Sequence, residues 1–289
     1  MFERISRSWQ LIKASWSVLK QDKHLLVFPL ISAVAALTGV VAFALPVLGL
    51  GALDGMSDAP GSTIPLLTYG LAFGFYISLY FVIFFFNAAL VGAAMIRLEG
   101  GAPTVADGLR VAQSRFLSIL GYAVIAATVG MVLRAVQERV GFLGSIVVSL
   151  LGAGWTMATY LVVPTLVASD VGPLEAVKSS ATTLKKTWGE NVVGQAGMGA
   201  GFALIHGVNL LLGVLLVVVF ASSQFGPGGT LALVVLSITG TVCMMVLIAL
   251  VQAALGGIYA AALYRYATLG EASSGFDARA MEQAFAPKR

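Results

Sequence analysis

The chain has 289 residues, of which 58% are apolar and only 10% carry a charge. Soluble domains carry about 25% charged residues, so no soluble fold could bury this much apolar surface, and the composition indicates a membrane protein with several spans. The net charge of +4 fits basic loops at one membrane face and gives no reason to expect nucleic acid as a partner. The single cysteine, Cys243, leaves no disulfide framework.

Residues 2–20 predict an amphipathic helix at the start of the chain. Apolar side chains recur at every third or fourth position, which places them in one stripe along a helix. They are Phe2, Ile5, Trp9, Ile12, Trp16 and Leu19. Because this stretch is too polar to cross a bilayer, we expect it to lie on the membrane surface, with Trp9 and Trp16 as interfacial anchors.

Six apolar runs follow this helix. They cover about residues 25–53, 64–96, 117–133, 140–169, 191–220 and 230–264. A spanning helix needs about 20 apolar residues, so we expect six transmembrane helices. The third run is the shortest, and with the fourth it could instead form a shallower hairpin. Pro29, Pro46 and Pro164 are expected to kink spans or to mark their ends.

The amphipathic pattern returns at 103–116 and at 173–188. Its apolar positions are Val105, Leu109, Ala112 and Phe116 in the second stretch, and Leu174, Val177, Ala181, Leu184 and Trp188 in the third. Phe116 and Trp188 end their stripes beside a membrane run, where interfacial anchors are expected. We therefore predict an all-α, polytopic membrane bundle of three repeats, each made of amphipathic helix, span, turn and span. A short amphipathic tail at 275–286 closes this single domain.

Basic residues gather on one side of the predicted membrane. Of the 17 Lys and Arg residues, all but Arg134 and Arg139 fall in the termini or in the connections on that side. Since Lys and Arg concentrate in cytoplasmic loops, we expect both termini to be cytoplasmic.

The start of the chain, FERISRSWQLIKASWSVLKQDKHLLVFPLIS, resembles the head of an uncharacterised prokaryotic family of multi-pass membrane proteins. The matching positions are Phe2, Arg4, Ser8, Trp9, Leu19, Asp22, Lys23, Leu25, Phe28 and Pro29. The resemblance implies a membrane fold without a known activity, in the cell membrane of a prokaryote. The six-span layout is also similar to the membrane part of some glycerophosphodiester phosphodiesterases, whose catalytic barrel this chain lacks, and more weakly to sulfate permeases.

A few polar residues fall inside the predicted spans. His206 and Asn209 share one helix face, while Asn87 and Gln252 occupy matching places near the ends of the second and sixth spans. These four residues are the candidates for an intramembrane polar site that binds a solute or relays a proton. Hydrogen bonds between helices are the simpler interpretation, and the one we favour.

Gly197 and Gly201 form a GxxxG pair inside the fifth run. Glycine loops that bind phosphate follow a strand and open a helix, so this pair predicts close helix packing instead of a nucleotide site.

The sequence contains no catalytic, metal or cofactor motif that we can identify, so we expect no enzyme and no cofactor. We predict a scaffold, accessory or lipid-interacting module with a basic cytoplasmic collar. Its partners would be anionic lipids, together with a membrane-protein partner or a second copy. The expected headgroup contacts are Arg4, Arg7, Lys13, Lys20 and Lys185. A channel or permease for a small solute is the alternative, and an interfacial lipid-modifying enzyme a remote one.

Overall fold

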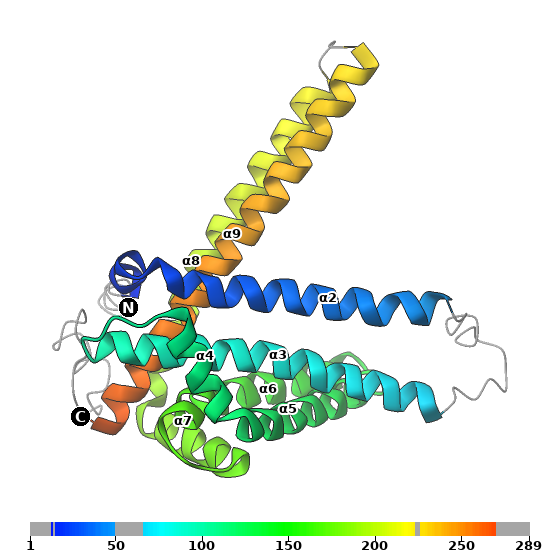
Figure 1. The fold of residues 1–289 in the computed structure, drawn as a ribbon. Coiled ribbons are helices and arrows are strands. Elements are labelled where there is room, and N and C mark those ends of the chain that lie inside the picture. Colours follow the sequence, from blue (N-terminus) through cyan, green and yellow to red (C-terminus); the bar gives the residue numbers. More distant parts are fainter. Residues whose placement is uncertain (1–12, 14, 50–65, 223–225, 270–289) are drawn as a thin grey trace.

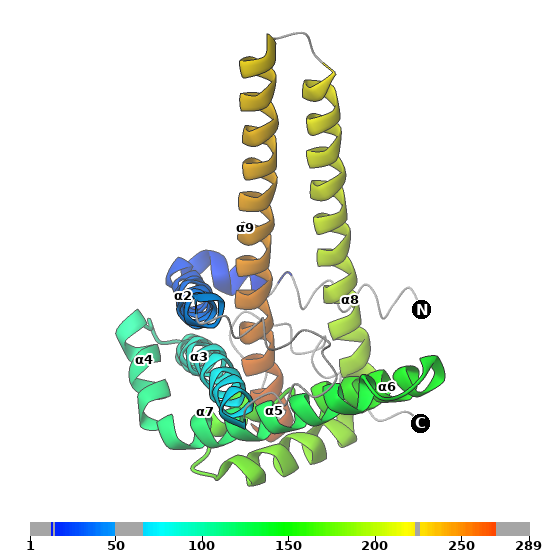
Figure 2. The same ribbon diagram turned by 90° about the vertical axis from the view of Figure 1, so that its right-hand side faces the viewer.

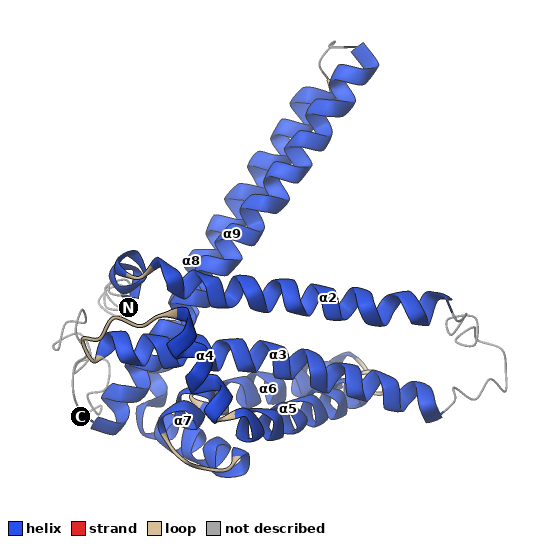
Figure 3. Ribbon diagram, in the orientation of Figure 1, coloured by secondary structure: helices blue, strands red, loops and turns tan. Residues whose placement is uncertain are grey.

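The computed structural model describes residues 13, 15–49, 66–222 and 226–269. Helices and short connections account for all of these residues, as Figure 3 shows. The helices are η1 (Lys23–Leu26), α2 (Val27–Gly49), α3 (Leu66–Leu98), α4 (Val105–Ser114), α5 (Phe116–Gln137), α6 (Phe142–Ala158), α7 (Val162–Ala168), α8 (Pro173–Ala221) and α9 (Gly226–Leu269). The predicted all-α class is confirmed.

Six helical segments in the described part of the chain are long and apolar enough to cross a membrane. They are Lys23–Leu45, Gly70–Leu98, Phe116–Gln137, Phe142–Ala168, Gly197–Ala221 and Gly228–Arg265. The six expected spans are therefore present, and the chain is an integral membrane protein. The third span, predicted as the shortest, is a helix of 22 residues, which is long enough to cross on its own.

The spans pair into three hairpins, α2–α3, α5–α6 and α8–α9, which separate from a common end (Figures 1 and 2). We call this end the base, and it comprises residues 15–28, 88–119, 161–184 and 254–265. Most of the buried apolar side chains lie in it. Away from the base the α8–α9 hairpin diverges from α2 and α3, and most of its apolar side chains are exposed.

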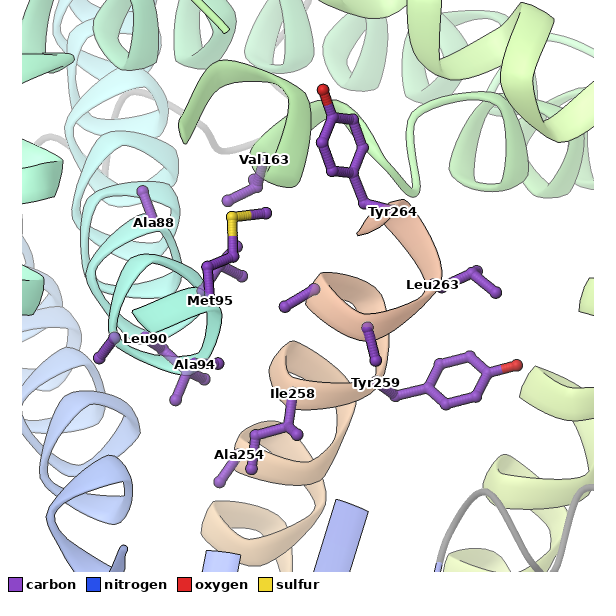
Figure 4. Packing of buried hydrophobic residues seen from close by; sticks show 14 of the residues in the cluster. Ala88, Leu90, Ala94, Met95, Val163, Ala254, Ile258, Tyr259, Leu263 and Tyr264 are labelled. Atoms are coloured by element: carbon purple, nitrogen blue, oxygen red, sulfur yellow. The ribbon is translucent and has the colours of Figure 1, made fainter. Parts of the chain in front are cut away.

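Small residues let the helices of the base approach closely. Ala88 and Ala94 of α3 and Ala254 of α9 are almost completely buried. Figure 4 shows Met95 of α3 pointing towards Val163 of α7, with the alanines and Ile258 in the same cluster. Close packing of this kind through small side chains is typical of helices in membranes.

Helix α4 is part of the base and packs against α3. It begins with a capping box, in which Asp107 N donates to the Thr104 hydroxyl at 3.2 Å and Thr104 N donates to the Asp107 carboxylate at 3.0 Å. A Cβ on Gly108 would come within 2.6 Å of the Ala89 carbonyl oxygen on α3, so only glycine fits at this contact. Ala112 is fully buried. Three positions of the predicted stripe, Val105, Leu109 and Ala112, thus contact the protein core, whereas we expected the stripe to lie on the membrane surface.

The third amphipathic stretch has a different arrangement. Residues 173–188 and the following span form one continuous helix, α8, of 49 residues. At 1.5 Å per residue, this helix is more than twice as long as the bilayer's hydrocarbon layer of about 30 Å, so its first turns extend beyond the span. The first stretch is helical at 15–21 and ends before η1. The three stretches do not share one arrangement, so the predicted repeat is not confirmed.

Candidate functional site

The fourth span is interrupted by a turn at residues 159–161, between α6 and α7. Pro164 accounts for the break, because it has no N–H to donate to the Tyr160 carbonyl and its ring would clash with that oxygen in a regular helix. Irregular backbone inside a membrane is tolerated only where protein or a cavity surrounds it. The expectation that Pro164 interrupts its span is therefore met.

Ser180, on the first turns of α8, satisfies backbone groups that the break leaves without helical partners. Its hydroxyl donates to the Ala158 carbonyl at 2.6 Å and accepts from the Leu161 N–H at 3.0 Å. The side chain is completely buried. A single serine from a neighbouring helix thus fixes the two ends of the break.

A cavity of about 340 Å³ lies beside the break. It is bounded by α2, α3, α9 and the turn that precedes α7. Its polar side chains are Ser32, Asn87 and Tyr160, and the rest of its described lining is Pro29, Ile83, Phe86, Leu90, Val91, Pro164, Ala253, Gly256, Gly257 and Ala260. None of these residues carries a charge. The position of a Cβ on Gly257 lies 3.5 Å from the Asn87 amide oxygen, so this oxygen faces the backbone of α9.

A second, larger cleft of about 770 Å³ lies on the other side of α9, between α8, α9 and the N-terminal helical residues. Lys13 and Trp16 line one end. The other lining residues are Met198, Gly201, Phe202, Leu204 and Ile205 of α8, and Met244, Leu247, Ile248, Val251 and Leu255 of α9. Trp16 is 41% exposed, and the Lys20 ammonium lies 5.6 Å from the centre of its indole ring. This cleft is therefore apolar throughout except at its basic end.

The predicted polar residues do not form a single site. Asn209 donates to the Thr241 carbonyl at 3.2 Å and so links α8 to α9, as the favoured interpretation requires. His206 lies one turn earlier on α8 and is half-buried. Asn87 lines the cavity, while Gln252 is not among the lining residues, so the expected pairing of these two amides is not seen there.

Gly201 does not make the close helix contact that we expected. A Cβ there would meet no described atom within 4 Å, because this position faces the cleft. Gly197 is exposed. The close approach of α8 to α9 falls instead at Gly213, where a Cβ would lie 2.3 Å from the Thr241 hydroxyl oxygen.

Several basic residues of the base bind protein groups. Arg265 pairs with Glu99, and Arg115 pairs with Asp170. Arg97 donates to the Gly101 carbonyl at 3.1 Å. Among the predicted headgroup contacts, Lys13 and Lys20 are exposed. Arg4, Arg7, Trp9 and the tail at 275–286 lie outside the described residues, as do the side chains of Lys185 and Trp188. Phe116 is 45% exposed and contacts Phe81 edge-on, with their ring centres 4.9 Å apart.

Sequence reasoning did not identify Ser32, Tyr160 and Ser180 as site residues. Pro164 was the available signal, because a proline within an apolar run marks the place where backbone groups need other partners. The partner itself, Ser180, lies in a segment predicted only as an amphipathic helix. Its role depends on the packing of α8 against the break, which the sequence pattern does not specify.

The family model of DUF6159, a family of unknown function, matches residues 66–276. This match covers most of the chain, which therefore belongs to that family. It begins after the head of the chain, residues 2–32, on which the predicted resemblance rested. No curated protein and no solved structure matches. The similarity in layout to the membrane part of glycerophosphodiester phosphodiesterases is not supported.

Proposed function

We propose that this chain is a non-catalytic membrane protein that binds an anionic lipid, with an acyl chain in the apolar cleft between α8 and α9. The cleft supports the proposal most directly. Its walls are apolar, and it lies along segments that are themselves apolar enough to span a membrane. Because hydrocarbon surrounds such segments, an acyl chain is the ligand that best matches these walls.

The basic end of the cleft favours a negative headgroup. Lys13 lines this end beside Trp16, and Lys20 stacks against the same tryptophan. A Lys near an anionic membrane surface contributes about 1 kcal/mol of attraction. Trp16, which is 41% exposed, suits the boundary between lipid and water, where tryptophan is enriched.

The proposal places the base at the cytoplasmic face of a prokaryotic cell membrane, because almost all basic residues lie on that side of the spans. There the exposed lysines form the basic collar predicted for headgroups. In this role the protein would serve as a scaffold or accessory beside another membrane protein or a second copy of itself.

Lipid retention by the full chain in mild detergent tests the proposal. Native mass spectrometry would count phosphatidylglycerol and phosphatidylcholine molecules that stay bound at matched concentrations. We expect preferential retention of phosphatidylglycerol. Gly201→Phe should abolish it, because the new ring fills the cleft without a clash, and Lys13→Gln should reduce the preference for the anionic lipid.

Matched variants separate binding in the cleft from general effects on the helix. Gly199→Phe adds the same ring on α8 at a position that is outside the cleft lining and equally free of neighbours, so it should leave retention unchanged. Lys178→Gln removes an exposed charge elsewhere on α8. Equal retention of both lipids by the natural protein, or an unaltered preference in Gly201→Phe, would rule the proposal out.

A further inference from the structure

The cavity beside the helix break has a composition different from that of the cleft, and this difference points to a different ligand. Hydrogen-bonding side chains reach it from three separate elements: Ser32 from α2, Asn87 from α3 and Tyr160 from the turn before α7. Each of these groups can both donate and accept a hydrogen bond.

The ligand of this cavity should be uncharged. No described lining residue is charged, and the cavity lies within the apolar spans. Transferring an ion there would cost its hydration without a counter-charge in return. A ligand hydroxyl group, by contrast, finds partners here that both donate and accept.

The remaining lining is apolar and comes from spans. Ile83, Phe86, Leu90, Val91 and Ala253 surround the polar groups. Gly256 leaves room for a ligand against the backbone of α9, because a Cβ there would meet no described atom within 4 Å, whereas the Leu90 side chain fills the space beside Gly257. A ligand with one hydroxyl-bearing end and an apolar body matches both parts of this lining.

We propose that the cavity bounded by α2, α3, α7 and α9 binds an uncharged lipid through a hydroxyl-bearing headgroup, which Ser32, Asn87 and Tyr160 hold by hydrogen bonds. This site is independent of the anionic-lipid cleft, since the two lie on different sides of α9 and share no lining residue. A monoacylglycerol, which has two free hydroxyls and one acyl chain, represents the proposed class.

Monoolein binding to the full chain in mild detergent is the test. Methyl oleate carries nearly the same acyl chain without a hydroxyl, and glycerol carries the hydroxyls without the chain. We expect monoolein to bind in preference to both. Tyr160→Phe should weaken monoolein binding about fivefold, the effect of one lost hydrogen bond, and Asn87→Leu should weaken it further. Neither variant should change the retention of methyl oleate.

Two further variants keep the test independent of folding and of the first site. Gly256→Leu fills the cavity, because a Cβ there meets no described atom within 4 Å, and it should abolish monoolein binding. Gly207→Leu on α8 adds the same side chain at an equally open position outside the lining and should bind normally. Tyr80→Phe is the matched control for Tyr160→Phe. All variants must retain the melting temperature of the natural protein to within a few degrees, and Gly256→Leu should still prefer phosphatidylglycerol.

Equal binding of monoolein and methyl oleate would overturn the proposal. Binding of glycerol as strong as that of monoolein would overturn the assignment to a lipid, because the chain would then contribute nothing. Loss of monoolein binding in Gly201→Phe, with Gly256→Leu unaffected, would place the ligand in the cleft instead and would also contradict it.

Discussion

Ser180 shows how one side chain can support a discontinuity in a membrane span. Its hydroxyl accepts from the Leu161 N–H and donates to the Ala158 carbonyl, although it lies about 20 residues further along the chain. The Ser180 side chain and its bond to Leu161 are buried, and its bond to Ala158 is partly buried. The position of the turn between α6 and α7 therefore depends on α8.

Replacing Ser180 by alanine should destabilise the protein by about 1–3 kcal/mol, because a buried N–H and a partly buried carbonyl would lose their partner. The melting temperature of the purified protein in detergent would report the loss. Ser179→Ala, at the neighbouring position of α8, should cause little change, since this side chain is only half-buried. Equal melting temperatures for both variants would show that the hydroxyl of Ser180 does not hold the break.

At the scale of single elements, α4 depends on its capping box. The hydrogen bonds that Asp107 receives from the Thr104 side chain and backbone lower the pKa of its carboxyl below the ordinary value of 3.8, with a smaller contribution from Arg110. A carboxyl with a lowered pKa in the folded state stabilises the fold above its unfolded pKa. That stabilisation is lost as the pH falls through the folded pKa.

The capping box should therefore give a specific pH dependence. At pH 6 we expect the natural protein to melt at a higher temperature than Asp107→Asn, because the carboxylate is ionised and accepts both bonds. As the pH falls below about 4 this difference should shrink, since Asp107 takes up its proton first in the unfolded chain and then, at lower pH, in the folded one, while asparagine does not titrate. A difference in melting temperature that stays constant from pH 6 to pH 3 would contradict the assignment.

The lengths of the spans were largely predictable, because each membrane span corresponds to an apolar run of similar length in the sequence. The run at 117–133 became α5 and the run at 140–169 became α6 and α7. The join of residues 173–188 to the next span was not predicted. The polar residues that precede the run at 191–220 suggested a boundary, yet no proline follows Pro173 within the segment, and residues 173–221 form one helix, α8.

The binding sites were less predictable than the spans. Asn87 was identified as a pocket residue, but the sequence paired it with Gln252 by similarity of position. The structure surrounds it with Ser32 and Tyr160 instead. Which residues face each other depends on the rotation and depth at which distant helices pack, and an apolar run does not encode either quantity.

At the scale of the whole molecule, packing is concentrated at the base while the hairpins are exposed elsewhere. Ile258 of α9 is completely buried there, whereas Leu236 of the same helix is 67% exposed. Lipid tails are as apolar as leucine. Burying an exposed leucine of a span against protein would therefore only replace its contacts with lipid by other apolar contacts.

Truncation of two side chains on α9 would test this distribution. Ile258→Ala should destabilise the protein by about 2–5 kcal/mol, the usual cost of a large-to-small change in a packed core. Leu236→Ala should change stability by less than about 0.5 kcal/mol. Unfolding by sodium dodecyl sulfate in mixed micelles would measure both. A larger loss for Leu236→Ala would mean that another surface packs on the α8–α9 hairpin.

The base also constrains the order in which the protein can be completed during synthesis. Its ion pair between Glu99 and Arg265 joins residues 166 positions apart, and the hydrogen bond between Ser169 and Tyr264 joins residues 95 apart. A ribosome makes the first five spans before α9 leaves it. Those spans must reside in the membrane with one side of their future core open, and the late arrival of α9 closes it.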